Sequence, residues 1–132
     1  MKHVVVVEDD AVNALLLRTV LQRRGGYRVT VTEDPHLLMT MARAGEVDLV
    51  VLDVSLNESR WNGELVNGID ICRILKQDEA TRRVPVLLAT AHAMRGDARR
   101  FLDESGADDY VSKPVELDGF IGQVRRWLPE AA

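Results

Sequence analysis

Three acidic residues follow two short apolar runs of the chain, and their types and spacing point to chemistry. Glu8 and Asp9 come directly after residues 4–7, and Asp53 comes directly after residues 49–52. A short apolar run rich in β-branched residues is typical of a buried central strand. Carboxylates at the carboxyl ends of such strands lie where open α/β sheets place their ligand crevice. We therefore expect the chemistry of the protein at this edge of a sheet.

Carboxylates gathered at one edge repel one another, and a hard divalent cation that prefers oxygen ligands relieves that repulsion. Mg²⁺ suits such a site because it takes one or two carboxylates together with waters and phosphate oxygens. Thr90 and Lys113 follow two further apolar runs, and they would offer a hydroxyl and a positive charge to phosphoryl oxygens. The pattern predicts that Asp53 is a nucleophile that forms an aspartyl phosphate.

Each of these residues also has an ordinary structural explanation when it is taken alone. Asp9 and the next residue, Asp10, are placed to cap a helix, and Asp53 could begin a surface loop. Thr90 could be a turn residue and Lys113 a solvated lysine. Their combination favours a functional site, because the chain has only three lysines and one of them follows the last predicted strand, next to Pro114.

The alternation of apolar patterns along the chain predicts five strands and five helices. This rhythm implies right-handed crossovers, a parallel sheet and helices on both faces. We expect strands at 3–7, 28–32, 49–53, 84–89 and 109–111, and helices at 11–24, 35–45, 68–77, 95–105 and 115–128.

Two of the predicted helices have clear apolar spacing. Asp10 is a plausible N-cap for the first helix, whose apolar residues at helical period are Val12, Leu15, Leu16, Val20 and Leu21. The last helix is expected to bury a stripe made of Leu117, Phe120, Ile121, Val124, Trp127 and Leu128. Residues 54–67 are polar and lack periodicity, which predicts a long loop; a loop of that length in a compact domain is often functional.

Length, composition and charge restrict the class of protein. The 132 residues suit one domain over 1–132, and the mixture of 46% hydrophobic and 29% charged residues is that of an ordinary globular protein. The net charge of −4 argues against nucleic-acid binding, and we interpret the scattered arginine pairs as solvated. The single cysteine, Cys72, indicates a reducing compartment and a small buried side chain rather than a reactive thiol. With no signal peptide or membrane-spanning stretch, we expect a cytoplasmic protein with no membrane partner.

Several segments spread over nearly the whole chain together carry a family resemblance. They are Val6 to Asp10, Leu52-Asp53, Ala89-Thr90-Ala91, Gly106 to Tyr110 and Lys113-Pro114. On these segments the chain resembles the receiver domain of two-component response regulators. The resemblance implies a flavodoxin-like (βα)5 fold, a doubly wound parallel sheet with strand order 2-1-3-4-5. It also implies that a sensor histidine kinase or a phosphotransfer protein donates a phosphoryl group to Asp53.

The resemblance assigns a metal role to particular residues of this chain. Asp9 and Asp53 would bind Mg²⁺ directly, and Glu8 would bind it through water. The backbone carbonyl of Ser55, two residues after the phosphoacceptor, would be a further ligand. Asp10, the third acid of its run, is expected to cap the first helix instead.

The resemblance also assigns a conformational switch to Thr90 and Tyr110. The threonine hydroxyl turns toward the phosphoryl group and the aromatic ring follows inward, which biases a two-state equilibrium. Tyr110 could instead be edge-of-core packing. The small Ala91 would leave the phosphoryl site accessible. Ser55 and His92 occupy positions that tune the lifetime of the phosphoryl group, although an inert His92 is an equal alternative.

One departure from the family pattern lies directly after the phosphoacceptor. Receivers usually carry a proline four residues after the acceptor, and Asn57 stands at that position here. Receivers also usually carry a glycine about eight residues after the acceptor. The matching glycine here is Gly68, 15 residues after Asp53, which makes the loop about seven residues longer than usual. Trp61 lies in this insertion, where it could anchor a partner or fold back onto the third helix. We favour folding back.

Other functions remain as alternatives to a phosphoacceptor module. The altered loop keeps open a phosphorylation-independent interaction domain with a receiver fold. A hydrolase with an aspartyl phosphate intermediate, like the haloacid-dehalogenase group, would need an aspartate where Ser55 stands. A flavin or nucleotide site is disfavoured because acids, not glycines, follow the first strand. We expect a protein that catalyses only its own phosphorylation and dephosphorylation.

The signal is expected to leave through a protein surface. The chain ends four residues after Leu128, which predicts no separate effector domain. The face formed by the fourth helix, the fifth strand and the last helix around Tyr110 would then contact an output protein, whose identity the sequence leaves open. A homodimer is a further possibility.

Overall fold

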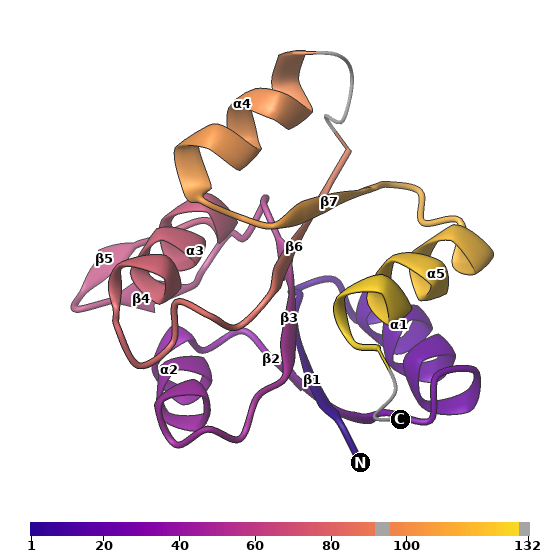
Figure 1. Cartoon of the computed structure of the whole chain (residues 1–132). Coiled ribbons are helices and arrows are strands. Elements are labelled where there is room, and N and C mark those ends of the chain that lie inside the picture. Colours follow the sequence, from indigo (N-terminus) through magenta and orange to yellow (C-terminus); the bar gives the residue numbers. More distant parts are fainter. Residues whose placement is uncertain (92–95, 130–132) are drawn as a thin grey trace.

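The computed structural model of the chain describes residues 1–91 and 96–129, without the side chains of 96–98. Its main sheet has five strands in the order β2-β1-β3-β6-β7, and every neighbouring pair is parallel (Figure 1). This arrangement confirms the flavodoxin-like fold, because β6 and β7 are the fourth and fifth strands of the predicted order. The strands are β1 (His3–Val7), β2 (Arg28–Thr32), β3 (Leu49–Asp53), β6 (Val86–Thr90) and β7 (Asp109–Ser112).

Helices cover both faces of the sheet (Figure 1). α1 (Ala11–Arg23) and α5 (Leu117–Trp127) lie on one face, and α2 (Pro35–Arg43) and α3 (Gly68–Gln77) lie on the other. α4 (Gly96–Ser105) contacts α3 and β7. The predicted start of this helix, Arg95, lies outside the described residues.

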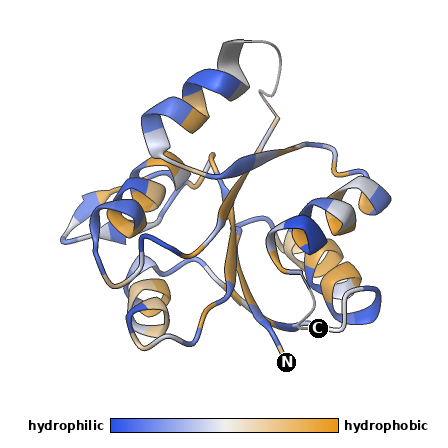
Figure 2. Cartoon of the chain, viewed as in Figure 1, coloured by the Kyte–Doolittle hydropathy of each residue, from blue (hydrophilic) through white to orange (hydrophobic). Residues whose placement is uncertain are grey.

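The alternation of side chains along β1 fills two separate cores. Val4 and Val6 belong to the core under α1 and α5, whereas Val5 and Val7 belong to the core under α2 and α3. All four valines are fully buried, which is possible only because both faces of the sheet are covered. Figure 2 shows the resulting band of hydrophobic residues along the central strands. An uninterrupted apolar run is therefore what this strand requires.

The α1 helix is confirmed, but its apolar residues do not all face the sheet. Val12, Leu15 and Leu16 are 77%, 64% and 40% exposed. The helix buries a different face, formed by Ala14, Leu17, Val20 and Leu21. Asp10 is the N-cap, and its carboxylate accepts hydrogen bonds from the backbone N–H groups of Val12 and Asn13. Apolar residues nearly surround this helix, so periodicity alone could not select the buried face.

The other predictions about packing hold in most positions. The predicted stripe of the last helix is confirmed at four buried residues, Phe120, Ile121, Val124 and the C-cap Leu128, while Leu117 and Trp127 are only partly buried. Cys72 is fully buried in α3, as expected. Burial raises the pKa of its thiol to about 11, which is unsuited to thiolate chemistry.

The stretch 54–67 is not the featureless loop that the sequence predicted. It contains a small antiparallel hairpin made of β4 (Arg60–Trp61) and β5 (Glu64–Leu65). Its two-residue turn is Asn62-Gly63, with φ values of 52° and 85°. Asn-Gly is a favoured pair for such a turn because both residues tolerate positive φ. The sequence reading missed the signal because each strand is too short for alternation to show.

Trp61 folds back against the domain, but not in the way that was expected. Its ring stacks on His36 of α2, with ring centroids 4.6 Å apart and an angle of 18° between the planes. The prediction that Trp61 folds back onto the domain is thus confirmed, but its stacking partner comes from the second helix and not the third.

Among the described residues, no helix is both long and apolar enough to cross a membrane.

Candidate functional site

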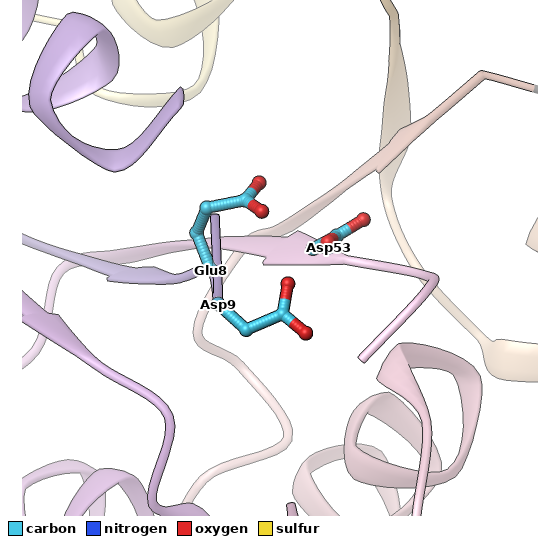
Figure 3. Close-up of side chains that lie close together, drawn as sticks. All are labelled: Glu8, Asp9 and Asp53. Atoms are coloured by element: carbon cyan, nitrogen blue, oxygen red, sulfur yellow. The ribbon is translucent and has the colours of Figure 1, made fainter. Parts of the chain in front are cut away.

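The parallel pairing of β1 and β3 brings their following residues to the same edge of the sheet. Val7 lies opposite Leu52, so Glu8 and Asp9 leave β1 where Asp53 ends β3. One carboxylate oxygen from each acid lies within 4.8 Å of the other two (Figure 3). The structure therefore brings together the three acids that the sequence placed at this edge.

Lys113 reaches the same cluster from the end of β7. Its Nζ lies 3.0 Å from Oδ1 of Asp53 and 3.1 Å from Oε2 of Glu8. Its backbone N–H donates a hydrogen bond to the carbonyl of Thr90, the last residue of β6, over 3.0 Å. One cation thus lies between two carboxylates that are 3% and 4% exposed as whole residues.

Each of the three carboxylates also accepts a hydrogen bond from the backbone. The N–H groups of Asp10, Ser55 and Asn57 donate to Glu8, Asp53 and Asp9, over 3.1, 3.1 and 3.2 Å respectively. These donors help to stabilise negative charge at the edge of the sheet. The sequence reading missed them, because a backbone N–H leaves no mark in residue type.

The electrostatics of Glu8 and Lys113 reflect their burial and their proximity. Burial raises the pKa of Glu8, and the nearby charge of Asp53 adds to that rise. Burial by itself would lower the pKa of Lys113, but its hydrogen bonds and charge interactions with Asp53 and Glu8 outweigh this effect and raise it. Lys113 is therefore held as a cation, whereas Glu8 is reluctant to ionise without another positive charge nearby.

The donor set fits a hard divalent cation. Three carboxylates converge, and one lysine offsets only part of their charge. Mg²⁺ prefers carboxylate and water oxygens and retains several waters. Asp9 is only partly buried, so its carboxylate remains accessible to water. The three acids thus could hold a magnesium ion, while the role of each residue toward the metal stays a prediction.

The loop after Asp53 is held by a close approach of α3. The N–H of Gly68 donates to the carbonyl of Val54 over 3.0 Å. A Cβ atom at Gly68 would overlap the carbonyl group of Asp53 and the Cα of Val54. Glycine is required here by space, because its φ is not in the left-handed region. Gly68 therefore allows α3 to begin directly against the backbone that carries the predicted phosphoacceptor.

The remaining predicted site residues occupy the neighbouring strands. Thr90 is buried at the end of β6, beside the acid cluster. Tyr110 lies on β7, where it lines a cavity of about 340 Å³ between this strand and α5. The switch role of this pair stays a prediction, as does the metal role of the Ser55 carbonyl. His92 lies outside the described residues.

Comparison with known proteins gives the same assignment as the geometry. The sequence matches the family described as the response regulator receiver domain over residues 4–125. It is 33% identical over 130 residues to the polar-differentiation response regulator DivK of Brucella ovis, an alignment that covers 98% of both chains.

Solved structures agree with the fold. The receiver domain of a sensor histidine kinase from Pseudomonas aeruginosa, which holds a magnesium ion in its active-site cleft, has a TM-score of 0.79 and 29% identity, with 98% of each chain covered. A putative response regulator from Chloroflexus aurantiacus has a TM-score of 0.82 and 25% identity, again over 98% of each chain. With the parallel sheet and the acid cluster already in place, these matches show that the chain belongs to the response regulator receiver family of two-component signalling.

Proposed function

We propose that Asp53 accepts a phosphoryl group from a phosphohistidine donor, carried by a sensor histidine kinase or a phosphotransfer protein. The observation that carries the proposal is the convergence of Asp53 with Glu8, Asp9 and Lys113 at one edge of the sheet. The similarity to a response regulator over nearly the whole chain supports it. In this role the protein is a signalling module and not a turnover enzyme.

The reaction needs a nucleophile and a means of holding the transferred charge. A carboxylate oxygen of Asp53 would attack phosphorus, and the bond from phosphorus to the imidazole nitrogen would break, with its electron pair returning to the ring. Lys113, whose Nζ lies 3.0 Å from Oδ1 of Asp53, would form an ion pair with a phosphoryl oxygen after the transfer. Thr90, at the end of the adjacent strand, would donate its hydroxyl to another oxygen.

The acids beside Asp53 would bind the cation that the reaction requires. Asp9 and Asp53 would ligate Mg²⁺ directly, Glu8 would do so through water, and the Ser55 carbonyl would add a ligand. When bound, Mg²⁺ would offset the negative charge shared by the carboxylates and the incoming phosphoryl group. The structure of the Pseudomonas receiver, with magnesium in its cleft, supports this choice of metal.

The output would pass through the face that carries Tyr110. Gln123 of α5 donates a hydrogen bond to the carbonyl of Tyr110 over 2.7 Å, and Nε1 of Trp127 donates to Asp109 over 3.2 Å. β7 and α5 are therefore tied together at the position of the switch. Reorientation of Thr90 and Tyr110 on phosphorylation would change this surface and its affinity for an output protein or a second copy.

The proposal is tested by incubating the chain with Mg²⁺ and a small acyl phosphate, followed by intact-protein mass spectrometry. We expect the addition of one phosphoryl group to the wild-type protein and none to Asp53→Asn. Asp10→Asn is the matched control, because Asp10 is a neighbouring acid that caps α1 and asparagine can also cap a helix.

Two results would overturn the proposal: an unchanged wild-type mass with several donors and with a phosphohistidine protein, or equal labelling of Asp53→Asn. The first result would favour the alternative of a phosphorylation-independent interaction domain.

A further inference from the structure

The segment that leads from Asp53 into the inserted hairpin is attached to the body of the domain at three residues. The hydroxyl of Ser59 donates a hydrogen bond to the carbonyl of Glu33 over 2.7 Å, and Ser59 is buried. Trp61 stacks on His36. Leu56 is buried in the core under α2 and α3. The segment that follows the phosphoacceptor is therefore fixed to the body of the domain.

Asn57 links this fixed segment to the cluster. Its backbone N–H lies 3.2 Å from Oδ2 of Asp9. Among the hydrogen bonds between described residues, this is the one that the Asp9 side chain accepts, whereas Glu8 and Asp53 each accept one from Lys113 as well as one from a backbone N–H. The least buried of the three acids thus depends on the hairpin segment for its orientation.

The geometry points to Asn57 as a positioning residue: its backbone N–H, held in place by the hairpin, orients Asp9 for Mg²⁺. Figure 3 shows the Asp9 carboxylate with one oxygen turned toward Asp53 and the other turned away. A donor that holds Asp9 in this rotamer before the metal arrives removes part of the ordering cost of binding. A chain with proline at this position has no N–H with which to do so.

The inference rests on the proposed function, since it concerns the same site, but its readout is metal binding without phosphoryl transfer. The test is calorimetric titration of the metal-free chain with MgCl2. Asn57→Pro removes the donor and should weaken Mg²⁺ binding about threefold to tenfold, the loss expected for one hydrogen bond. The conservative variant Asn57→Ala keeps the N–H and should bind like the wild type.

The contributions of the hairpin and of the Asp9 carboxylate are tested in the same titration. Trp61→Ala loosens the stack on His36 without touching the cluster, and it should weaken Mg²⁺ binding in the same direction by a smaller factor. In an Asp9→Ala background, Asn57→Pro should have no further effect, because the oxygen that it orients is gone. Circular dichroism without metal checks the fold of each variant, and if Asn57→Pro does not fold, Trp61→Ala decides the matter.

Unchanged or tighter Mg²⁺ binding by folded Asn57→Pro would overturn the inference. The inference would also be overturned if Asn57→Pro weakened Mg²⁺ binding by the same factor in the wild-type and in the Asp9→Ala background. The N–H of Asn57 would then act on a group other than Asp9. Failure of the proposed function would look different: the wild type would bind Mg²⁺ with this dependence on Asn57 and yet take up no phosphoryl group.

Discussion

The Glu8 carboxylate has opposite effects on folding and on metal binding: its ionised form is disfavoured by burial but is the form that would attract a cation. Its carboxylate is buried beside Asp53, and burial raises its pKa. A raised pKa in the folded state means that folding favours the protonated form. The stability that Glu8 contributes is therefore present at low pH and is lost as the pH rises through its raised pKa. Ionisation of Glu8 in the metal-free protein therefore lowers the free energy of unfolding.

Replacing this carboxylate should therefore separate stability from metal affinity. Glu8→Gln is expected to raise the melting temperature of the metal-free protein at pH 7, by about 4 °C for each kcal/mol gained. The same change should weaken Mg²⁺ binding about tenfold, since one negative charge leaves the site. Thermal unfolding with and without MgCl2 measures both effects.

Glu58→Gln, at an exposed position outside the cluster, serves as the control and should change neither quantity. A lower melting temperature for metal-free Glu8→Gln would show that the hydrogen bonds of this carboxylate stabilise the fold by more than its burial destabilises it.

In the wild type, Mg²⁺ affinity should fall as the pH drops through the raised pKa of Glu8, because protons then compete with the metal.

At the scale of an element, the first residue of α3 decides where the phosphoacceptor loop lies. Gly68→Ala would force a Cβ into the backbone of Asp53 and Val54. We expect a loss of about 1–3 kcal/mol in the free energy of unfolding, the usual cost of inserting a methyl group where there is no space. Urea denaturation measures this loss, and a displaced Asp53 should also weaken Mg²⁺ binding.

A second glycine offers a matched comparison on another helix. A Cβ at Gly122 of α5 would meet nothing within 4 Å, so Gly122→Ala should stabilise the protein by about 0.5–1 kcal/mol through higher helix propensity. A neutral or stabilising effect of Gly68→Ala would show that the steric account of Gly68 is wrong.

At the scale of the whole molecule, the site joins distant parts of the chain. Its acids come from the ends of β1 and β3, and its lysine follows β7, 105 residues after Glu8. Only the folded sheet brings these groups together, so a cation that binds them stabilises the folded state alone. Metal binding and global stability are thus linked.

That linkage predicts a rise in melting temperature with Mg²⁺ concentration. At ten times the dissociation constant, binding should add about 1.4 kcal/mol to the free energy of unfolding. Scanning fluorimetry over a series of MgCl2 concentrations measures the shift, and EDTA should reverse it. Asp53→Asn should show a smaller shift, while a shift of wild-type size in that variant would place the cation elsewhere.

The sequence by itself determined the alternation of strands and helices and the identity of the clustered residues. Continuous apolar runs specify strands that are buried on both faces, and parallel strands necessarily end at one edge. Glu8, Asp53 and Lys113 could therefore be predicted to meet from their positions after such runs. The resemblance to receivers then supplied the strand order, which periodicity does not contain.

Only the tertiary structure decided which face of α1 is buried, what the 54–67 stretch forms and how the acids are held. Leu15 and Leu17 are the same kind of residue, and packing against the sheet alone determines which is buried. The hairpin has two-residue strands, so its stability comes from contacts such as the stack of Trp61 on His36. The N–H of Asn57 meets Asp9 across 48 positions, and a backbone group common to nearly all residues gives no sequence signal of its partner.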